Sequence, residues 1–340
     1  MLNESGSTRR TYLVTGGAGF IGSHLVEALL ARGDLVIALD NLSTGRLRNL
    51  DAVGQHANFR FVHGSVLDDL LVDELVHESD VVVHLAAAVG VQLIVEKPLR
   101  SFTTNIRGSE TVIEAAHRYR RRILLASTSE IYGKNGNGGV PLVEDADRLL
   151  GSPSVARWAY STAKVVDEIL AYAYHRERGL ATTVARLFNT VGPRQSPAYG
   201  MVIPRLVRQA VRAEPLTVYG DGRQTRCFCH VLDVVDGLLR LIDDPRTHGE
   251  CFNLGSQEEV SILELAQRIL ETAESSSPIE LVPYEKAYVA GFEDMRRRVP
   301  DIGKVRGLTG WSPRRTLDDI LAETIVEARA ELAGATAGLS

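Results

Sequence analysis

Short apolar runs alternate, through the first half of the chain, with longer segments whose apolar residues recur every three or four positions. The short runs are rich in Val, Ile, Leu and Thr, which is typical of strands buried on both faces. Six strands are predicted, at residues 11–15, 35–39, 59–63, 81–85, 122–127 and 181–186. Because helical patterns separate several of them, the strands are predicted to run parallel through βα crossovers, as in a doubly wound α/β fold.

The pattern changes after about residue 189, where Gly and Pro interrupt shorter elements. A chain of 340 residues is long enough for two lobes. We expect a Rossmann-like domain at 10–188, to which part of 226–255 returns, and a smaller C-terminal substrate lobe at 189–330. Residues 1–9 and 331–340 are small and polar and are expected to be flexible tails.

A glycine-rich turn follows the first predicted strand. Gly16, Gly19 and Gly22 stand at G-x-x-G-x-x-G spacing, and a helix over 20–32 comes next. Such a turn brings backbone close to a pyrophosphate and aims helix N–H groups at it, although a simple tight turn would show the same spacing. Asp40 ends the second strand, where an acidic residue takes the adenosine ribose hydroxyls and repels a 2′-phosphate. The pattern therefore predicts NAD rather than NADP.

A tyrosine and a lysine one helical turn apart carry the candidate chemistry. Tyr160 and Lys164 project from the same helical face, so the ammonium is expected to lower the pKa of the phenol and let it act as a base near neutral pH. This pairing indicates redox chemistry on an alcohol. Thr128, Ser129 and Glu130 follow the fifth strand and are expected to face the nicotinamide, with Thr128 bonding the reacting hydroxyl. Capping of the next segment is the alternative role for Thr128.

Composition excludes several classes of partner. A formal charge of −5, a pI near 6.0 and scattered basic residues argue against nucleic acid or an anionic membrane as a partner. Neither a membrane-spanning apolar stretch nor a signal-peptide pattern is found, so a cytoplasmic protein is expected. Cys227, Cys229 and Cys251 are odd in number and lack metal-ligand spacing, which indicates reduced cysteines and no metal.

Seven segments in a fixed order carry a resemblance to a known family: GGAGFIGSHL, DNLSTG, HLAAAVGV, STSEIYG, YSTAK, RLFNTVGPRQ and VYGDGRQTRCFCHVLDV. Together, over roughly residues 12–322, they resemble the extended short-chain dehydrogenase/reductase family, in its group of nucleotide-sugar epimerases, dehydratases and decarboxylases. The resemblance implies tightly bound NAD and a UDP-sugar that is oxidised at C4 through Tyr160, Lys164 and Thr128.

The resemblance also implies binding residues. For the cofactor these are Gly16, Gly19, Phe20, Ile21, Gly22, Asp40, Asn41, Ser43, Thr44, Gly45, Ser65, Val66, Leu85, Ala86, Ala87, Tyr160 and Lys164. For the substrate they are Thr128, Ser129, Asn189, Arg194, Val202, Thr217, Tyr219, Arg226 and Arg298. Asn189, Arg226 and Arg298 are implied as contacts of the diphosphate. The strand that holds Thr217 and Tyr219 is expected near the uracil, although core packing of Tyr219 is an alternative.

Three departures from the family pattern bear on the reaction. Ser65 replaces an aspartate near the adenine, Val89 replaces a lysine of the neutral-hexose epimerases, and loop 86–91 lacks the Ser/Pro-rich segment typical of the decarboxylases. These features favour a UDP-glucuronate 4-epimerase that forms UDP-galacturonate through a 4-keto intermediate, with Arg194 reaching toward the C6 carboxylate. Arg194 as a surface charge is the alternative for that residue.

Other functions stay open. Glu130 is typical of the decarboxylases that the chain resembles, so a UDP-glucuronate decarboxylase that forms UDP-xylose is the alternative function. A UDP-glucose 4-epimerase and a non-catalytic NAD-binding protein are less favoured. The helix over 158–174 carries apolar residues on more than one face, so a homodimer is expected, as in relatives that pair this helix between subunits.

Overall fold

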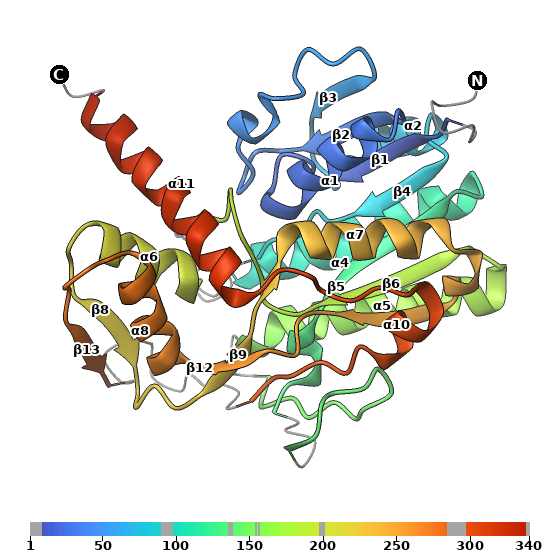
Figure 1. The fold of residues 1–340 in the computed structure, drawn as a ribbon. Coiled ribbons are helices and arrows are strands. Elements are labelled where there is room, and N and C mark those ends of the chain that lie inside the picture. The colour runs from blue at the N-terminus through green and yellow to red at the C-terminus, as the bar shows by residue number, and fades with distance from the viewer. Residues whose placement is uncertain are drawn as a thin grey trace.

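The structure, a computed structural model, describes residues 9–89, 98–134, 139–153, 155, 157–196, 201–283 and 297–337. Its centre is a seven-stranded parallel sheet in the order β11-β6-β5-β4-β1-β2-β3, which confirms the predicted fold class (Figure 1). The strands are β1 (Thr11–Thr15), β2 (Leu35–Asp40), β3 (Phe59–His63), β4 (Val81–His84), β5 (Arg122–Thr128), β6 (Thr182–Leu187) and β11 (Glu250–Leu254).

Helices cover both faces of this sheet. One face carries α1 (Phe20–Ala31), α7 (Val231–Asp243) and α10 (Gly303–Thr309), and the other carries α2 (Asp69–His77), α4 (Pro98–Arg118) and α5 (Arg157–Arg178). Neighbouring residues of one strand serve the two layers: Tyr12 and Val14 pack under the first face, and Leu13 packs under the second. This two-sided burial explains why the strands read as continuous apolar runs.

The smaller lobe has its own apolar core. It contains α6 (Val202–Val211), β8 (Leu216–Tyr219), β9 (Thr225–Cys227), β12 (Glu259–Ser261), α8 (Ile262–Thr272), β13 (Ile279–Val282) and α11 (Leu317–Ala337). Two short parallel strands, β7 (Thr190–Val191) and β10 (Cys229–His230), pair where the chain passes between the smaller lobe and the sheet domain. The described residues also include the 3₁₀ turns η1 (Leu47–Leu50), η2 (Ser129–Tyr132) and η5 (Pro245–Thr247).

Two expected boundaries differ from the structure. Ile302, Val305 and Trp311 pack in the core beneath α1 and α7, so this part of the expected 189–330 lobe belongs to the sheet domain. The buried Trp311 ring donates its Nε1–H to the Asp233 carbonyl of α7 at 2.9 Å, an anchor that sequence spacing does not reveal. At the C-terminus, α11 continues to Ala337, so the expected tail from 331 begins inside a helix. Residues 1–8 and 338–340 of the expected tails lie outside the described residues.

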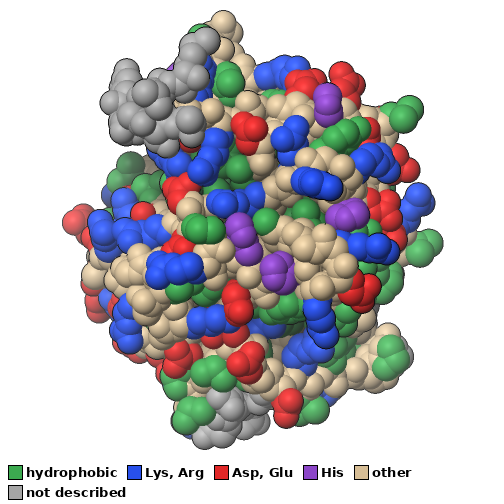
Figure 2. Space-filling model, turned by 90° about the vertical axis from the view of Figure 1, so that its right-hand side faces the viewer, with side chains coloured by type: hydrophobic (Ala, Val, Ile, Leu, Met, Phe, Trp, Pro, Cys, Tyr) green, Lys and Arg blue, Asp and Glu red, His purple; other side chains and the backbone are tan. Residues whose placement is uncertain are grey.

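The surface carries mixed charge. Figure 2 shows basic and acidic side chains interspersed over the face at the right-hand side of Figure 1. Among the helices of the described ranges, none has the length and apolar character that crossing a membrane requires.

Candidate active site

A cleft of about 460 Å³ opens at the carboxyl ends of β1, β2, β4, β5 and β6. Ligands of doubly wound sheets bind at this edge, because the loops there meet at the point where the strand order reverses. Most of the predicted cofactor and substrate residues line this cleft. Their contacts with the cofactor or sugar stay predictions.

The glycine-rich turn has the shape that a dinucleotide requires. Gly16 has φ +72°, and a Cβ there would lie 2.9 Å from the Ala86 nitrogen, while a Cβ at Gly22 would overlap the Gly16 carbonyl oxygen. Helix α1 begins after Gly19 with no capping side chain and no acidic residue in its first turn. Its first N–H groups are therefore open to an anion such as a pyrophosphate. Gly16, Gly19, Phe20, Ile21 and Gly22 all line the cleft.

Asp40 lies at the expected adenosine end of the cleft. It is 8% exposed, and its carboxylate accepts the N–H groups of Ala18 at 3.0 Å and Leu42 at 2.8 Å. Burial raises the pKa of Asp40, and these two hydrogen bonds oppose the rise. Each carboxylate oxygen has a second lone pair, so Asp40 can also accept ribose hydroxyls.

Some of the predicted cofactor residues near Asp40 line the cleft, and others only contact the residues around it. Asn41, Ser43, Thr44 and Val66 line the cleft. Gly45 and Ser65 do not: a Cβ at Gly45 would lie 2.8 Å from Asp40 Oδ2, and the Ser65 hydroxyl accepts the Leu67 N–H at 3.2 Å. The described contacts of these two residues support the surrounding backbone, and their direct contact with the cofactor stays a prediction.

Replacing Asp40 with Ala should weaken NAD binding by roughly ten- to a hundredfold, because a charge-assisted acceptor of the ribose is lost. The same change should narrow the preference for NAD over NADP, since the repulsion of the 2′-phosphate also disappears. Cofactor titration of protein stripped of nucleotide measures both effects. Asp40→Asn, which keeps an acceptor for one of the two N–H groups of Ala18 and Leu42, removes the charge with less loss of local structure than Asp40→Ala. Equal affinity of the unmodified protein for NAD and NADP would contradict the role of Asp40.

The segment after β4 forms the middle of the cleft. Leu85, Ala86 and Ala87 line it. Thr15 Oγ1 accepts the Ala86 N–H at 3.2 Å and lies 2.8 Å from His84 Nδ1, and His84 Nε2 lies 3.1 Å from the Ser109 hydroxyl. Burial, followed by the charge of Lys164, lowers the pKa of His84 to about 3. His84 is therefore neutral and holds the segment in place.

Tyr160, Lys164 and Thr128 meet in the cleft, as their spacing predicts. Tyr160 and Thr128 share a hydrogen bond, and Thr128 Oγ1 also accepts the Glu130 N–H at 3.2 Å as the cap of η2. The two roles considered for Thr128, cap and partner of the phenol, thus coexist. Lys164 is 3% exposed, and its ammonium lies 3.0 Å from the Asp167 carboxylate, a partner that the sequence pattern did not single out.

The pKa of Tyr160 differs from the expectation. Burial raises it above its ordinary value, Lys164 opposes the rise, and Glu130 and Asp167 add to it. Burial alone would lower the pKa of Lys164, but Asp167 and Tyr160 outweigh burial and raise it, so the lysine stays charged. The Lys164 ammonium therefore lowers the pKa of Tyr160, as predicted, but burial raises that pKa by more than the ammonium lowers it.

A buried ion pair fixes the helix that carries Tyr160. Glu168, on α5, accepts the Ser127 hydroxyl at 2.5 Å and binds the Arg186 guanidinium through both carboxylate oxygens, at 3.0 and 2.8 Å. Ser127 and Arg186 belong to β5 and β6. The bidentate pair ties α5 to both strands and so sets the position of Tyr160 relative to Thr128.

Glu130, Ser129 and Arg298 form a second cluster beside the redox residues. The Arg298 guanidinium is 5% exposed and donates to Glu130 Oε1 at 2.6 Å and to the Ser129 hydroxyl at 3.0 Å. All three residues line the cleft. The resemblance implies that Arg298 contacts the diphosphate, which stays a prediction. In the structure its guanidinium lies near the end of β5, against Ser129 and Glu130.

The Arg194 guanidinium has partners within the protein, so the described contacts do not support its expected role as a reader of the substrate carboxylate. Its guanidinium pairs with Glu27 at 2.6 Å and donates to the Ser23 hydroxyl at 3.2 Å, and both partners lie on α1. The side chain lines the cleft but already has an anionic partner. A substrate carboxylate would have to displace Glu27.

The predicted uracil strand lies away from the described cleft. The Thr217 N–H donates to Gln209 at 3.1 Å, its carbonyl accepts from Arg205 at 2.7 Å, and the Tyr219 ring packs on the Arg205 guanidinium at 4.2 Å. Both backbone groups of Thr217 are thus used within the lobe. Val202, Thr217, Tyr219 and Arg226 do not line the cleft, whereas Asn189, with φ +23°, does. The 8% exposed Arg226 donates to the Thr225 carbonyl at 2.8 Å.

Several cleft residues escaped prediction. Arg46 and Asn49 line the adenosine end, and Gln195, Ser196 and Met201 line the side of the smaller lobe. Asn105 is 1% exposed and accepts the Ala88 N–H at 2.7 Å, which orients the cleft wall after β4. A polar residue inside an apolar helix face was the available signal for Asn105. No local pattern marks the others.

Comparison with known proteins identifies the family. Residues 12–255 match the NAD dependent epimerase/dehydratase family, so the chain belongs to it and uses NAD. It is 41% identical over 318 residues to a UDP-N-acetyl-alpha-D-glucosaminuronate decarboxylase of Bacillus cytotoxicus, covering 93% of this chain and 97% of that protein. It is 39% identical to UDP-glucuronic acid decarboxylase 2 of Arabidopsis thaliana, over 90% of this chain and 65% of the plant protein's length.

A solved relative shows the same architecture. The UDP-glucuronic acid 4-epimerase of Bacillus cereus, solved with UDP-glucuronic acid and NAD, is 29% identical with a TM-score of 0.85, over 94% of this chain and 99% of that one. The expectation of a 4-epimerase is nevertheless wrong, because decarboxylases match at 39–41% identity over 90–93% of the chain. The missing Ser/Pro-rich segment of loop 86–91 favoured the epimerase, whereas Glu130, which favoured the decarboxylase, lines the cleft and pairs with Arg298. Residues 90 and 91 of that loop lie outside the described residues.

Proposed function

We propose that the protein is an NAD-dependent decarboxylase of UDP-glucuronate that forms UDP-xylose and carbon dioxide. The observation that carries the proposal is the Glu130–Arg298 pair at the reacting end of the cleft. A C4 epimerisation changes no bond at C5 and has no use for an acid and a guanidinium there. The decarboxylases at 36–41% identity support the same choice.

The first chemical step uses Tyr160. Bound NAD, held in the cleft by the glycine-rich turn and Asp40, would supply the acceptor for the C4 hydride and the donor that gives it back. Tyr160 takes the proton of the C4 hydroxyl, with Thr128 orienting that hydroxyl and the phenol. Lys164, held charged by Asp167, stabilises the phenolate.

The second step uses the neighbouring cluster. With C4 oxidised, the sugar is a β-keto acid: the bond from C5 to the carboxyl carbon breaks, carbon dioxide leaves, and the electron pair passes into an enolate. The Arg298 guanidinium lies where that negative charge forms and stabilises it in a largely buried site. Glu130 relays a proton taken from water to C5, where it replaces the bond to the departed carbon dioxide. The hydride would then return to C4 and the Tyr160 proton to O4, which completes UDP-xylose.

The test is product identification. Incubated with UDP-glucuronate and no added NAD, the protein should yield a UDP-pentose lighter by the mass of carbon dioxide, because the hydride returns to the same sugar. UDP-N-acetyl-glucosaminuronate, run in parallel, separates the two substrate classes of the relatives. A product of unchanged mass would contradict the proposal, and exclusive turnover of the N-acetylated sugar would change its substrate.

We also propose that the protein is a homodimer through α4 and α5, which pack on one another. Leu99 and Ile169, one on each helix, are 79% and 54% exposed. Large apolar side chains exposed on adjacent helices are typical of a subunit interface. Sedimentation equilibrium should give twice the chain mass, and a monomer at micromolar concentration would contradict this arrangement.

A further inference from the structure

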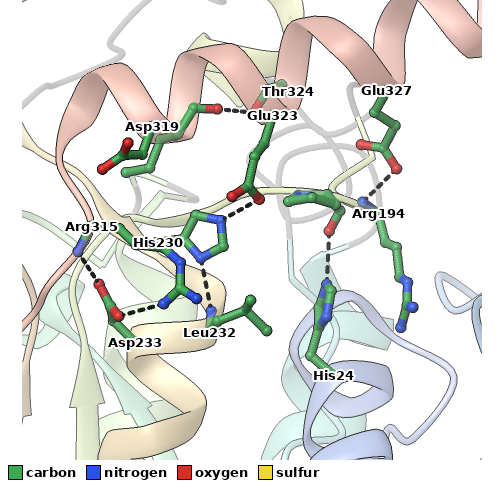
Figure 3. Close-up of polar contacts among 12 residues, drawn as sticks. His24, Arg194, His230, Leu232, Asp233, Arg315, Asp319, Glu323, Thr324 and Glu327 are labelled. Atoms are coloured by element: carbon green, nitrogen blue, oxygen red, sulfur yellow. Dashed lines mark hydrogen bonds and ion pairs between the residues drawn. The ribbon is translucent and has the colours of Figure 1, made fainter.

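One peptide group between the smaller lobe and the sheet domain is held from both sides (Figure 3). The Pro193 carbonyl accepts from His24 Nε2 at 3.1 Å, and the N–H of the same peptide, from Arg194, donates to Glu327 Oε1 at 2.7 Å. His24 belongs to α1 and Glu327 to α11. Since a carbonyl only accepts, His24 must carry its proton on Nε2. The peptide is thus clamped between the cofactor helix and the C-terminal helix.

The clamp holds a backbone that would otherwise relax. Arg194 has φ +70°, a conformation that costs a non-glycine residue about 1 kcal/mol or more. Its guanidinium grips α1 through Ser23 and Glu27. Just before it, Gly192 has φ +141°, and a Cβ there would lie 2.9 Å from Val231 Cγ1. The loop therefore has one arrangement, fixed by contacts with three helices.

This loop forms a wall of the cofactor cleft. The loop residues that line the cleft are Thr190, Arg194, Gln195 and Ser196. Across from them, Phe20, Ile21 and Gly22 line it from the first turn of α1, the turn that is built for a pyrophosphate. Because Arg194 joins the loop directly to α1, a dinucleotide seated at that turn lies beside a closed loop.

Helix α11 is a firm support for the clamp. Ile320, Leu321 and Ile325 are buried in the core of the smaller lobe, next to α6 and α8. Burial raises the pKa of Glu327, and the Arg194 N–H and the charges of Arg48 and Arg194 oppose the rise, while Glu331 adds to it. Figure 1 shows α11 running from the smaller lobe past the edge of the sheet domain.

We propose that Glu327 is a positioning residue for cofactor retention: by holding the Pro193–Arg194 peptide, it keeps the loop closed over bound NAD. Retention matters because the hydride removed from a sugar must return to that sugar, so loss of the cofactor between the two steps leaves an unfinished product. The inference rests on NAD as cofactor and holds whichever sugar reaction the enzyme performs.

The test measures exchange of bound NAD for isotopically labelled NAD. Glu327→Ala should exchange roughly ten- to a hundredfold faster than the unmodified protein, which corresponds to the loss of one hydrogen bond to a charged group. The variant should be purified with less NAD, and saturating NAD should restore its kcat. Glu327→Gln keeps an acceptor oxygen and should exchange at close to the original rate. Val326→Ala, a truncation of the neighbouring and 67% exposed side chain on α11, is the control and should exchange at the original rate.

The opposite side of the peptide gives an independent check. His24→Ala removes the donor to the Pro193 carbonyl and should also accelerate exchange, so it decides the matter if Glu327→Ala does not fold. Unchanged exchange in a folded Glu327→Ala protein would overturn the proposal. So would a Gln variant that leaks NAD as fast as the Ala variant, or a loss of kcat that saturating NAD does not repair. Because exchange is measured without sugar, the exchange outcomes do not depend on the decarboxylase assignment; only the kcat measurement does.

Discussion

Tyr160→Phe is expected to lower kcat by about 10²–10⁴-fold while the NAD content of the purified protein stays unchanged. The substitution removes only the phenol hydroxyl, which bonds Thr128 and is the base for the C4 hydroxyl. Single-turnover assays and nucleotide release on denaturation measure the two quantities. Tyr174→Phe, on the same helix with its ring against His117, is the matched control and should retain normal activity. A Tyr160→Phe enzyme that works at near-normal rate would remove Tyr160 from the chemistry.

The rate should also rise with pH, because the phenolate is the active form and burial raises the pKa of Tyr160. Replacing Lys164 with Met removes the positive charge that favours the phenolate. The rising limb of the pH profile should therefore move to higher pH in that variant. A profile that stays in place would show that Lys164 does not act on the phenol.

Glu130→Gln is expected to lower the rate of UDP-xylose formation by about 10²–10⁴-fold, because the amide cannot deliver a proton to C5. The Arg298 guanidinium keeps an oxygen partner, so the fold should survive. Carbon dioxide released in a single turnover, without matching UDP-xylose, would locate the block after decarboxylation. Ser129→Ala, which removes the hydrogen bond between the guanidinium and the Ser129 hydroxyl but leaves the acid, should lose much less activity. A Glu130→Gln enzyme as active as the Ser129→Ala enzyme would contradict the role of Glu130.

What the sequence predicted well depends on local patterns. Gly16, Gly19 and Gly22 are required by backbone geometry within one turn, and Tyr160 and Lys164 by the period of one helix. Thr128 followed from a rule of its fold class, that ligands gather at the carboxyl ends of parallel strands. Each of these predictions needed only neighbouring residues and the class of sheet. The structure brings the predicted groups together in one cleft.

The predictions that the described contacts do not support involve partners far apart in the chain. The Arg194 guanidinium binds Glu27, 167 residues away, and its N–H binds Glu327, 133 residues away. Nothing near Arg194 in sequence announces either carboxylate, so a substrate carboxylate looked equally suitable. The backbone of Thr217 is used by Arg205 and Gln209, which project from α6 only once the lobe has folded.

The choice of reaction failed for a related reason. Epimerase and decarboxylase share the Tyr160 chemistry and differ in which groups surround C5 and the carboxylate. That difference lies in the approach of Arg298 to Glu130 across 168 residues of chain. A motif around Glu130 alone leaves open whether its carboxylate faces solvent, a diphosphate or an arginine. The structure places it against the arginine, inside the cleft.

The most direct test of this account is the fate of the C6 carbon. UDP-glucuronate labelled at its carboxyl carbon should release one labelled carbon dioxide for each molecule consumed, with no added NAD and with UDP-xylose as the nucleotide product. Label that remains in the nucleotide sugar, as in UDP-galacturonate, would contradict the assignment of the Glu130–Arg298 cluster to decarboxylation.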